Sequence, residues 1–190
     1  GREALGAHEV PVHVMPRMRQ FLTANGPWEQ LVALRNMVLN PLEADTPFEL
    51  NDRLRITPRI VPHRDEYSET VGFLIQGPQR RVLFIPDINK WELWNVPLEE
   101  ALAEVDVAYL DATFFDGEEL PGRDLSEIPH PFVVETMRRL AELPASERSK
   151  VRFIHLNHTN PALRGDSAAT RQIREAGFQI AVEGETIYLG

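Results

Sequence analysis

The sequence of 190 residues contains no cysteine, and this absence excludes several kinds of site at once. Disulfide frameworks, thiolate nucleophiles and Cys-ligated zinc or iron–sulfur centres all need the missing side chain. A metal ion in this protein must therefore be held by His, Asp or Glu.

Long apolar runs and an excess of positive charge are also missing. The apolar runs cover only a few residues, far below the roughly 20 needed to cross a bilayer, so we expect no membrane span. The 20 Lys and Arg are outnumbered by 29 Asp and Glu, and the net charge of −9 argues against a nucleic-acid partner. No initiator methionine is present, and residues 1–6 are interpreted as the end of a helix closed by Gly6. We therefore expect the chain to continue upstream.

The composition, 43% hydrophobic and 26% charged, is typical of a globular protein, and we expect one domain over residues 1–190. Apolar alternation and buried-type apolar runs predict strands, and 3.6-residue periodicity with Pro and Gly at the ends predicts helices. The expected strands are 10–14, 48–50, 54–57, 71–75, 81–86, 105–110 and 151–154. The expected helices are 16–22, 27–34, 98–103, 131–143 and 167–176, followed by a hairpin of 178–182 with 186–189.

Chemically versatile side chains gather where the predicted elements end. They are His63 in a polar loop between two strands, Asp87 and Asp111 closing buried strands, His130 between prolines ahead of a helix, and His155 and His158 after a strand. Each alone has a structural explanation, such as a turn cap or a solvated imidazole. Taken together, in a chain without cysteine, they indicate a divalent metal site made of imidazoles and carboxylates. His8 and His13 are interpreted as surface or packing residues.

Four segments resemble the later motifs of the metallo-β-lactamase superfamily. They are His63 ahead of the strand Val71-Gly72-Phe73-Leu74-Ile75, Phe84-Ile85-Pro86-Asp87, Tyr109-Leu110-Asp111-Ala112-Thr113-Phe114, and Phe153-Ile154-His155-Leu156-Asn157-His158-Thr159-Asn160-Pro161. The order and spacing carry the resemblance, with 24 residues from His63 to Asp87 and 68 from Asp87 to His155. The most similar branch is that of the coenzyme PQQ synthesis protein B and its relatives.

The resemblance implies an α/β fold of the αββα sandwich type, with a metal site at one edge of the two sheets. The superfamily's His-x-His-x-Asp-His motif does not occur in the sequence. We therefore expect an N-terminally incomplete domain that lacks its first strands and its first metal-binding motif. In such a domain the apolar side chains of Val82, Phe84 and Val107 would be less covered than usual.

The resemblance also implies roles for individual residues. His63 matches a histidine that binds the first metal, and Asp87 matches a carboxylate that can bridge two metals. His155 matches a ligand of the second metal, with His158 as the competing candidate.

Asp111-Ala112-Thr113-Phe114 resembles the Glu-Ala-Thr-Phe element of the ribonuclease Z branch. His130 resembles that branch's helix-start histidine, which helps to protonate the leaving group. An Asp111 carboxylate that orients the His130 imidazole would suit this role, so both residues are expected to be catalytic.

The function expected of the full-length form is metal-dependent hydrolysis of a small-molecule ester or phosphodiester, and the activity of the 190-residue chain alone stays open. Zinc is the expected metal, with manganese and iron as alternatives. Since only two or three of the family's ligands are present, we expect weak zinc binding. Two other functions stay open: a role like that of the PQQ protein, in which the metal supports oxidation of a precursor, and a non-catalytic module. The residues leave the oligomeric state and the compartment open.

Overall fold

The computed structural model describes residues 6–190, so the predicted helix end at residues 1–6 lies almost entirely outside the described part. The strands are β1 (Val10–Val14), β2 (Met37–Pro41), β3 (Phe48–Asn51), β4 (Leu54–Ile60), β5 (Val71–Gln76), β6 (Arg81–Ile85), β7 (Val107–Asp111), β8 (Val151–Ile154) and β9 (Gln179–Ile180). The α-helices are α2 (Pro16–Ala24), α3 (Trp28–Ala33), α4 (Leu98–Ala103), α5 (Val133–Arg139), α6 (Ala145–Arg148) and α7 (Ala168–Glu175). Short 3-10 turns are η1 (Trp91–Leu93), η2 (Gly117–Glu119), η3 (Leu125–Glu127) and η4 (Pro161–Leu163).

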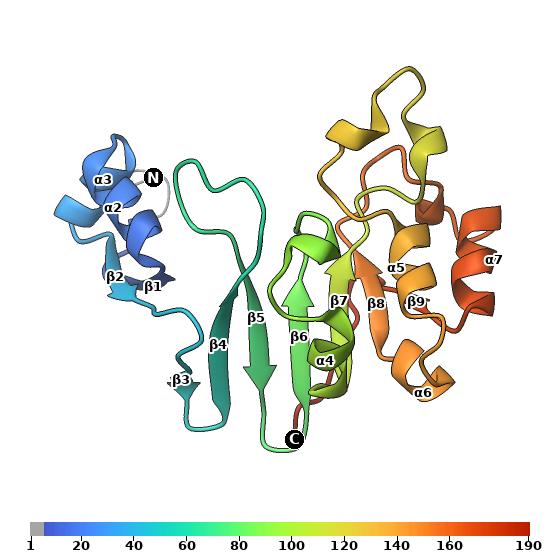
Figure 1. The fold of residues 1–190 in the computed structure, drawn as a ribbon. Helices are drawn as coiled ribbons and strands as arrows, with labels where there is room; N and C mark the ends of the chain where they lie inside the picture. The colour runs from blue at the N-terminus through green and yellow to red at the C-terminus, as the bar shows by residue number, and fades with distance from the viewer. Residues whose placement is uncertain (1–5) are drawn as a thin grey trace.

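A seven-stranded mixed sheet forms the centre of the molecule, with the order β3-β4-β5-β6-β7-β8-β9 (Figure 1). Its first four strands pair antiparallel, and from β6 onward the strands run parallel. Short turns connect β3 to β4 and β5 to β6, and the longer loop 61–70 connects β4 to β5, whereas the parallel strands are joined through segments that contain helices. The predicted change from a strand-rich middle to alternating strands and helices is confirmed.

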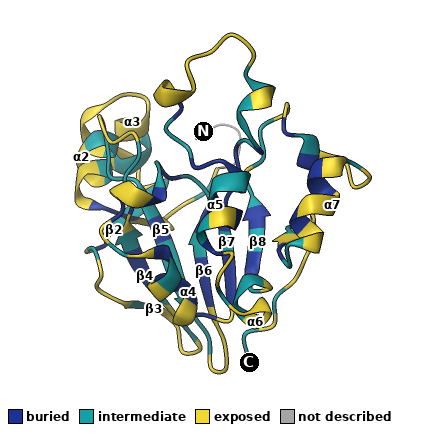
Figure 2. Ribbon diagram, turned by 45° about the vertical axis from the view of Figure 1, so that its right-hand side comes forward, coloured by how far each residue is buried: buried dark blue, intermediate teal, exposed yellow. Residues whose placement is uncertain are grey.

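Helices α4, α5 and α7 cover one face of the parallel strands and bury the main core (Figure 2). Every second residue of a strand points to the same face, so Leu83 and Ile85 of β6 enter this core together with Ala108 and Leu110 of β7. Phe153 of β8 is fully buried beside them. This packing makes the central strands a rigid base for the loops that follow them.

The carboxyl ends of four strands lie at one edge of the sheet. Strands β6, β7 and β8 run parallel, and β4 and β6 both run antiparallel to β5. The loops after these four strands therefore meet at the same edge, the upper one in Figure 1. Asp111 is the last residue of β7, and the other candidate residues predicted from the sequence lie in the loops that follow these four strands.

A separate parallel pair, β1 and β2, holds α2 and α3 at the side of the main sheet (Figure 1). Strand β2 was not predicted from the sequence, because the segment 37–41 is short and ends in a proline. Helices α2 and α3 bury no residue, as their teal and yellow colouring shows in Figure 2. The Glu69 carboxylate joins this unit to the loop after β4 by accepting hydrogen bonds from the backbone N–H groups of Arg17 and Met18.

Helix α5 is shorter than the predicted helix 131–143. Phe132 has an extended backbone, so the helix begins after it, and Leu140 already departs from helical geometry. Pro144 disfavours helical backbone at the residue before it, which limits any extension toward Leu143.

The predicted C-terminal hairpin is wrong. Ile180 of β9 instead pairs in parallel with Phe153, and the chain then turns and leaves the sheet edge. Its last residues reach the β5–β6 turn, where the Leu189 carbonyl accepts hydrogen bonds from the backbone N–H groups of Gln79 and Arg80. These distant partners replace the local hairpin pairs.

Val82, Phe84 and Val107 were expected to be less covered than usual, and this expectation is wrong for the two valines. Val82 and Val107 are each only 5% exposed, while Phe84 is partly buried. These side chains lie on the sheet face opposite the main core, and the segment 181–190, here called the C-terminal tail, crosses this face. Within residues 6–190, no helix has the length and apolarity required to span a membrane.

Candidate metal centre

His63 and Asp87 approach each other from the loops after β4 and β6. The His63 Nε2 atom lies 3.2 Å from Asp87 Oδ1. The other ring nitrogen, Nδ1, lies 3.0 Å from the side-chain oxygen of Asn89. Because an amide oxygen can only accept, Nδ1 must carry the proton of this hydrogen bond.

The close approach of His63 and Asp87 fits a shared cation. In a neutral imidazole with its proton on Nδ1, Nε2 presents a lone pair, and the facing carboxylate oxygen also only accepts. Asp87 Oδ1 is buried and has no hydrogen-bond partner among the described residues. Two ligands of a tetrahedral zinc, each roughly 2.0–2.1 Å from the metal, lie about 3.3 Å apart, which is close to the observed separation. The donor set at this point therefore suits a divalent metal.

Asp111, at the end of β7, is the buried centre of the hydrogen-bond network. Its Oδ1 accepts from the backbone N–H and the hydroxyl of Thr113, at 2.8 and 2.7 Å. Its Oδ2 accepts from the backbone N–H of Ile88 at 3.1 Å and from Nδ1 of His130 at 2.9 Å. Burial raises the pKa of Asp111, but the hydrogen bonds from His130 and Thr113, together with the nearby His155 imidazole, outweigh it and lower the pKa to about 2. The carboxylate is thus ionised, and its lone pairs are taken by donors rather than left for a metal.

His130 lies between the two carboxylates, just before α5. Its Nδ1 atom, which donates to Asp111, is also 3.4 Å from Asp87 Oδ1. The ring centre is 5.2 Å from that of His63 and 6.4 Å from that of His155. With Nδ1 committed to Asp111, Nε2 is the atom of His130 that can exchange a proton or bind a ligand.

His155 follows β8 directly and has a positive φ of 65°. Residues other than glycine rarely adopt this left-handed backbone conformation. Such strained residues cluster at functional sites. The nearby Asp111 carboxylate raises the pKa of His155, assisted by the charge of Asp87 and opposed by burial. His158 contacts Asn157 instead and belongs to neither group of side chains that could share a metal among the described residues.

The structure gathers five of the six candidate residues into two overlapping groups. Within the described residues, ligand atoms of His63, Asp87 and His130 lie within 4.8 Å of one another, and so do those of Asp87, Asp111 and His155. Sequence reasoning assigned no role to Asn89 or to Thr113, whose side chains contact the imidazoles. Their positions could have indicated such a role, because Asn89 follows Asp87 by two residues and Thr113 follows Asp111 by two.

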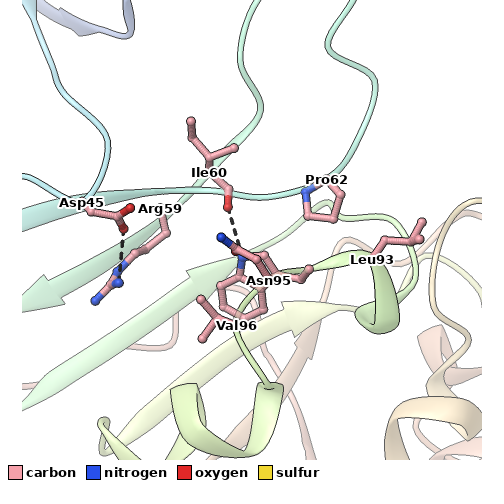
Figure 3. A pocket seen from close by; sticks show the side chains of 8 residues that line it. Asp45, Arg59, Ile60, Pro62, Leu93, Asn95 and Val96 are labelled. Carbon is pink, nitrogen blue, oxygen red and sulfur yellow. Dashed lines mark hydrogen bonds and ion pairs between the residues drawn. The ribbon is translucent and has the colours of Figure 1, made fainter.

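A pocket of about 390 Å³ lies beside the start of the loop after β4 (Figure 3). It opens between the end of β4 and the loop 93–96, with Ile60, Leu93 and Val96 among its apolar walls. Its one cationic side chain, Arg59, is paired with Asp45 at 3.2 Å. None of the candidate metal ligands lines this pocket, so the chemistry of the site is concentrated at the sheet edge.

The chain is similar to proteins named coenzyme PQQ synthesis protein B. The protein of this name from Methylobacterium sp. (strain 4-46) is 28% identical over 132 residues, which make up 65% of this chain and 42% of that protein. The chain thus spans about half the length, or less, of such curated relatives.

Two solved structures share the fold. The Zn²⁺-bound PqqB from Methylobacterium extorquens superposes with a TM-score of 0.76 at 20% identity, over 95% of this chain and 65% of that one. The metallo-beta-lactamase fold protein YhfI from Bacillus subtilis superposes with a TM-score of 0.56 at 14% identity, over 96% and 65% of the two chains.

A model of the beta-lactamase superfamily domain matches residues 2–156. This match covers most of the chain, including His63, Asp87, Asp111, His130 and His155. Together with the two fold neighbours, it confirms the resemblance and the fold class predicted from the sequence motifs. The chain therefore belongs to the beta-lactamase superfamily.

Proposed function

We propose that this protein is a metal-dependent hydrolase that acts on a small-molecule ester or phosphodiester. One observation carries the proposal: the Nε2 atom of His63 faces the buried, unpartnered Oδ1 of Asp87 at 3.2 Å. Two acceptors at this distance repel each other unless a proton or a metal cation lies between them.

The proposed ligands are His63 and Asp87 for one metal ion, and Asp87 and His155 for a second. Zinc suits the imidazole and carboxylate donors best, with manganese and iron as alternatives. When bound, such a cation would supply Lewis acidity and a water molecule of lowered pKa. The PqqB structure named above contains Zn²⁺, which supports the choice of zinc as the metal.

His130 is the proposed proton donor to the leaving group. Asp111 holds its Nδ1–H, which directs Nε2 away from the buried carboxylate. Because the low pKa of Asp111 keeps this carboxylate ionised, it accepts the Nδ1–H hydrogen bond and fixes the ring for proton transfer through Nε2. Asp111 thereby orients His130 rather than binding metal.

The net charge of −9 favours a small substrate over a polynucleotide. Two protein ligands for each ion, without a chelating His-x-His pair, hold zinc loosely, so we expect weak binding by the 190-residue chain.

The first test is a zinc titration of the purified chain with a competing chelator. We expect saturable but weak binding, with less than one equivalent retained after dialysis against metal-free buffer. H63A, D87A and H155A each weaken binding by at least about tenfold, the lower end of the loss seen when even an outer partner of a metal ligand is removed. H8A, which removes a largely exposed imidazole outside the cluster, serves as the control. Retention of stoichiometric zinc, or loss of zinc in H158A but not in H155A, would contradict the ligand set.

The second arm of the test is hydrolysis of an activated phosphodiester and of a lactone by the zinc-loaded chain. H130A lowers kcat by about 10²–10⁴-fold while zinc affinity is retained, since a proton donor acts on the reaction and not on metal binding. Unchanged hydrolysis in H130A removes this residue from the mechanism.

A second function is favoured by the curated relatives, which are named for coenzyme PQQ synthesis. In such a role the metal would support oxidation of a peptide-derived precursor. Metal binding without hydrolysis of either substrate favours this second function. The absence of saturable metal binding favours a non-catalytic module instead.

A further inference from the structure

The Thr113 hydroxyl lies among three ionisable side chains of the candidate metal centre. Its Oγ1 atom is 2.7 Å from Asp111 Oδ1, 3.2 Å from Nδ1 of His155 and 3.3 Å from Nδ1 of His130. Thr113 is only 9% exposed, so water does not compete freely for these contacts.

Counting protons determines the direction of each hydrogen bond. A hydroxyl has one proton to donate and two lone pairs. An ionised carboxylate only accepts, so the Thr113 proton points to Asp111. Toward His155 and His130 the hydroxyl can then only accept, and both imidazoles must carry a proton on Nδ1.

The two imidazoles differ in how far they depend on Thr113. His130 has a second acceptor for its Nδ1–H, the Oδ2 atom of Asp111 at 2.9 Å. His155 has none at such a distance, since its Nδ1 is 3.8 Å from Asp111 Oδ1. Its side chain is also 46% exposed, so without the hydroxyl the ring is free to exchange between its two neutral tautomers.

We propose that Thr113 is a positioning residue that sets the Nδ1–H tautomer of His155 and so leaves Nε2 available to a metal ion. The proposal rests on the metal site proposed above. It assigns Thr113 the place that an outer hydrogen-bond acceptor takes behind many metal-binding histidines. His63 has a similar partner in Asn89.

The test is long-range ¹H–¹⁵N NMR of the imidazoles in the metal-free 190-residue chain, at a pH where they are neutral. In the wild type we expect His155 to be mainly the Nδ1–H tautomer. T113V replaces the hydroxyl with a methyl group of similar size, and the Nε2–H form of His155 then becomes substantially populated. T113S keeps the hydroxyl and restores the wild-type spectrum.

His130 and His63 are internal controls, since Asp111 and Asn89 still accept from their Nδ1–H groups in T113V. A change in all three imidazoles would indicate a general disturbance and would overturn the specific role. If T113V does not fold, T113A gives the same comparison with less steric change. An unchanged His155 tautomer in the folded variant overturns the proposal.

Zinc affinity supplies an independent readout. We expect T113V to bind zinc about 10–100-fold more weakly than the wild type, and T113S to bind like the wild type. Unchanged affinity despite a shifted tautomer overturns the link to metal binding. If the wild type itself binds no zinc, the proposed metal site fails, whereas the NMR comparison still decides what Thr113 does to His155.

Discussion

Asp111 accepts four hydrogen bonds in a fully buried position, from Ile88, His130 and twice from Thr113. In D111N, an NH₂ group replaces one carboxylate oxygen. This group donates hydrogen bonds, but the groups around it are donors too, so it cannot pair with them. We expect D111N to lower the free energy of unfolding by about 2–4 kcal/mol, because buried donors lose their partner and cannot reach water. Urea unfolding of the metal-free chain measures this loss.

The matched control for D111N is D106N. Asp106 lies at an exposed position and accepts a single hydrogen bond from the backbone N–H of Arg81, at 2.8 Å. Its replacement should cost no more than about 1 kcal/mol, since water can satisfy the donor. Equal stability of the two variants would show that the Asp111 network contributes little to folding.

Residue types at strand ends were sufficient to find His63, Asp87, Asp111, His130 and His155 as candidates. The sequence also predicted that Asp111 orients His130, and the two side chains lie 2.9 Å apart. The partners of the other imidazoles, Asn89 and Thr113, were not predicted, because their contacts depend on how separate loops pack against one another. In the sequence His155 matched the family's histidine, with His158 as the competing candidate three residues later. The backbone turn after β8 separates them by directing only His155 toward Asp111.

At the scale of elements, helix α2 depends on a distant carboxylate at its N-terminus. Burial raises the pKa of Glu69, but hydrogen bonds from the backbone N–H groups of Arg17 and Met18 outweigh it, so the pKa lies below its ordinary value of 4.5. A lowered pKa means that the folded state favours the charged form. The ionised Glu69 carboxylate therefore stabilises the folded state fully above pH 4.5, and this stabilisation is lost as the pH falls through the lowered pKa.

We expect E69Q to be less stable than the wild type by about 0.5–1 kcal/mol at pH 7, the usual value of an anion at a helix N-terminus. The difference should shrink as the pH falls below 4.5, the ordinary pKa of the carboxyl group. Urea unfolding across this range measures it. E66Q is the control from the same loop, because the Glu66 side chain pairs with Arg64 and not with α2. A difference that stays constant with pH would contradict the capping role.

The elements with strong local signals were predicted, and those that need distant partners were not. The segments of β5 and β6 are recognisable because both are strongly apolar, as expected of strands paired on both sides. β2 forms by pairing with β1, and the C-terminal tail takes its path from contacts with other strands, so neither has a local pattern that determines it. Long-range pairing thus outweighs local turn propensity in these segments.

At the scale of the whole molecule, the C-terminal tail covers the sheet face opposite the helices. Glu185 pairs with Arg152 of β8 at 2.5 Å, and Leu189 reaches the turn after β5. The tail therefore crosses from β8 to β5 over the face that carries Val82 and Val107. This path explains why these two valines are buried although the second sheet of the sandwich was expected to cover them.

We expect G77A to loosen the tail, because a Cβ atom at Gly77 would meet Leu189 Cβ at 2.5 Å and its carbonyl oxygen at 2.7 Å. The free energy of unfolding should fall by about 1–3 kcal/mol, and binding of a hydrophobic fluorescent dye should increase as the valine face is exposed. G165A is the control, since a Cβ there meets no atom within 4 Å. Equal dye binding by both variants would show that the tail does not shield this face.

The sequence by itself determined the class of donor atoms, the superfamily and the order of the central elements. These properties follow from residue types and local apolar patterns, which need no distant partner. The tertiary structure alone decided which imidazoles meet, which nitrogen of each ring is free, and how the tail covers the sheet. Such contacts join residues tens of positions apart, so strand register and loop packing set them rather than any local pattern.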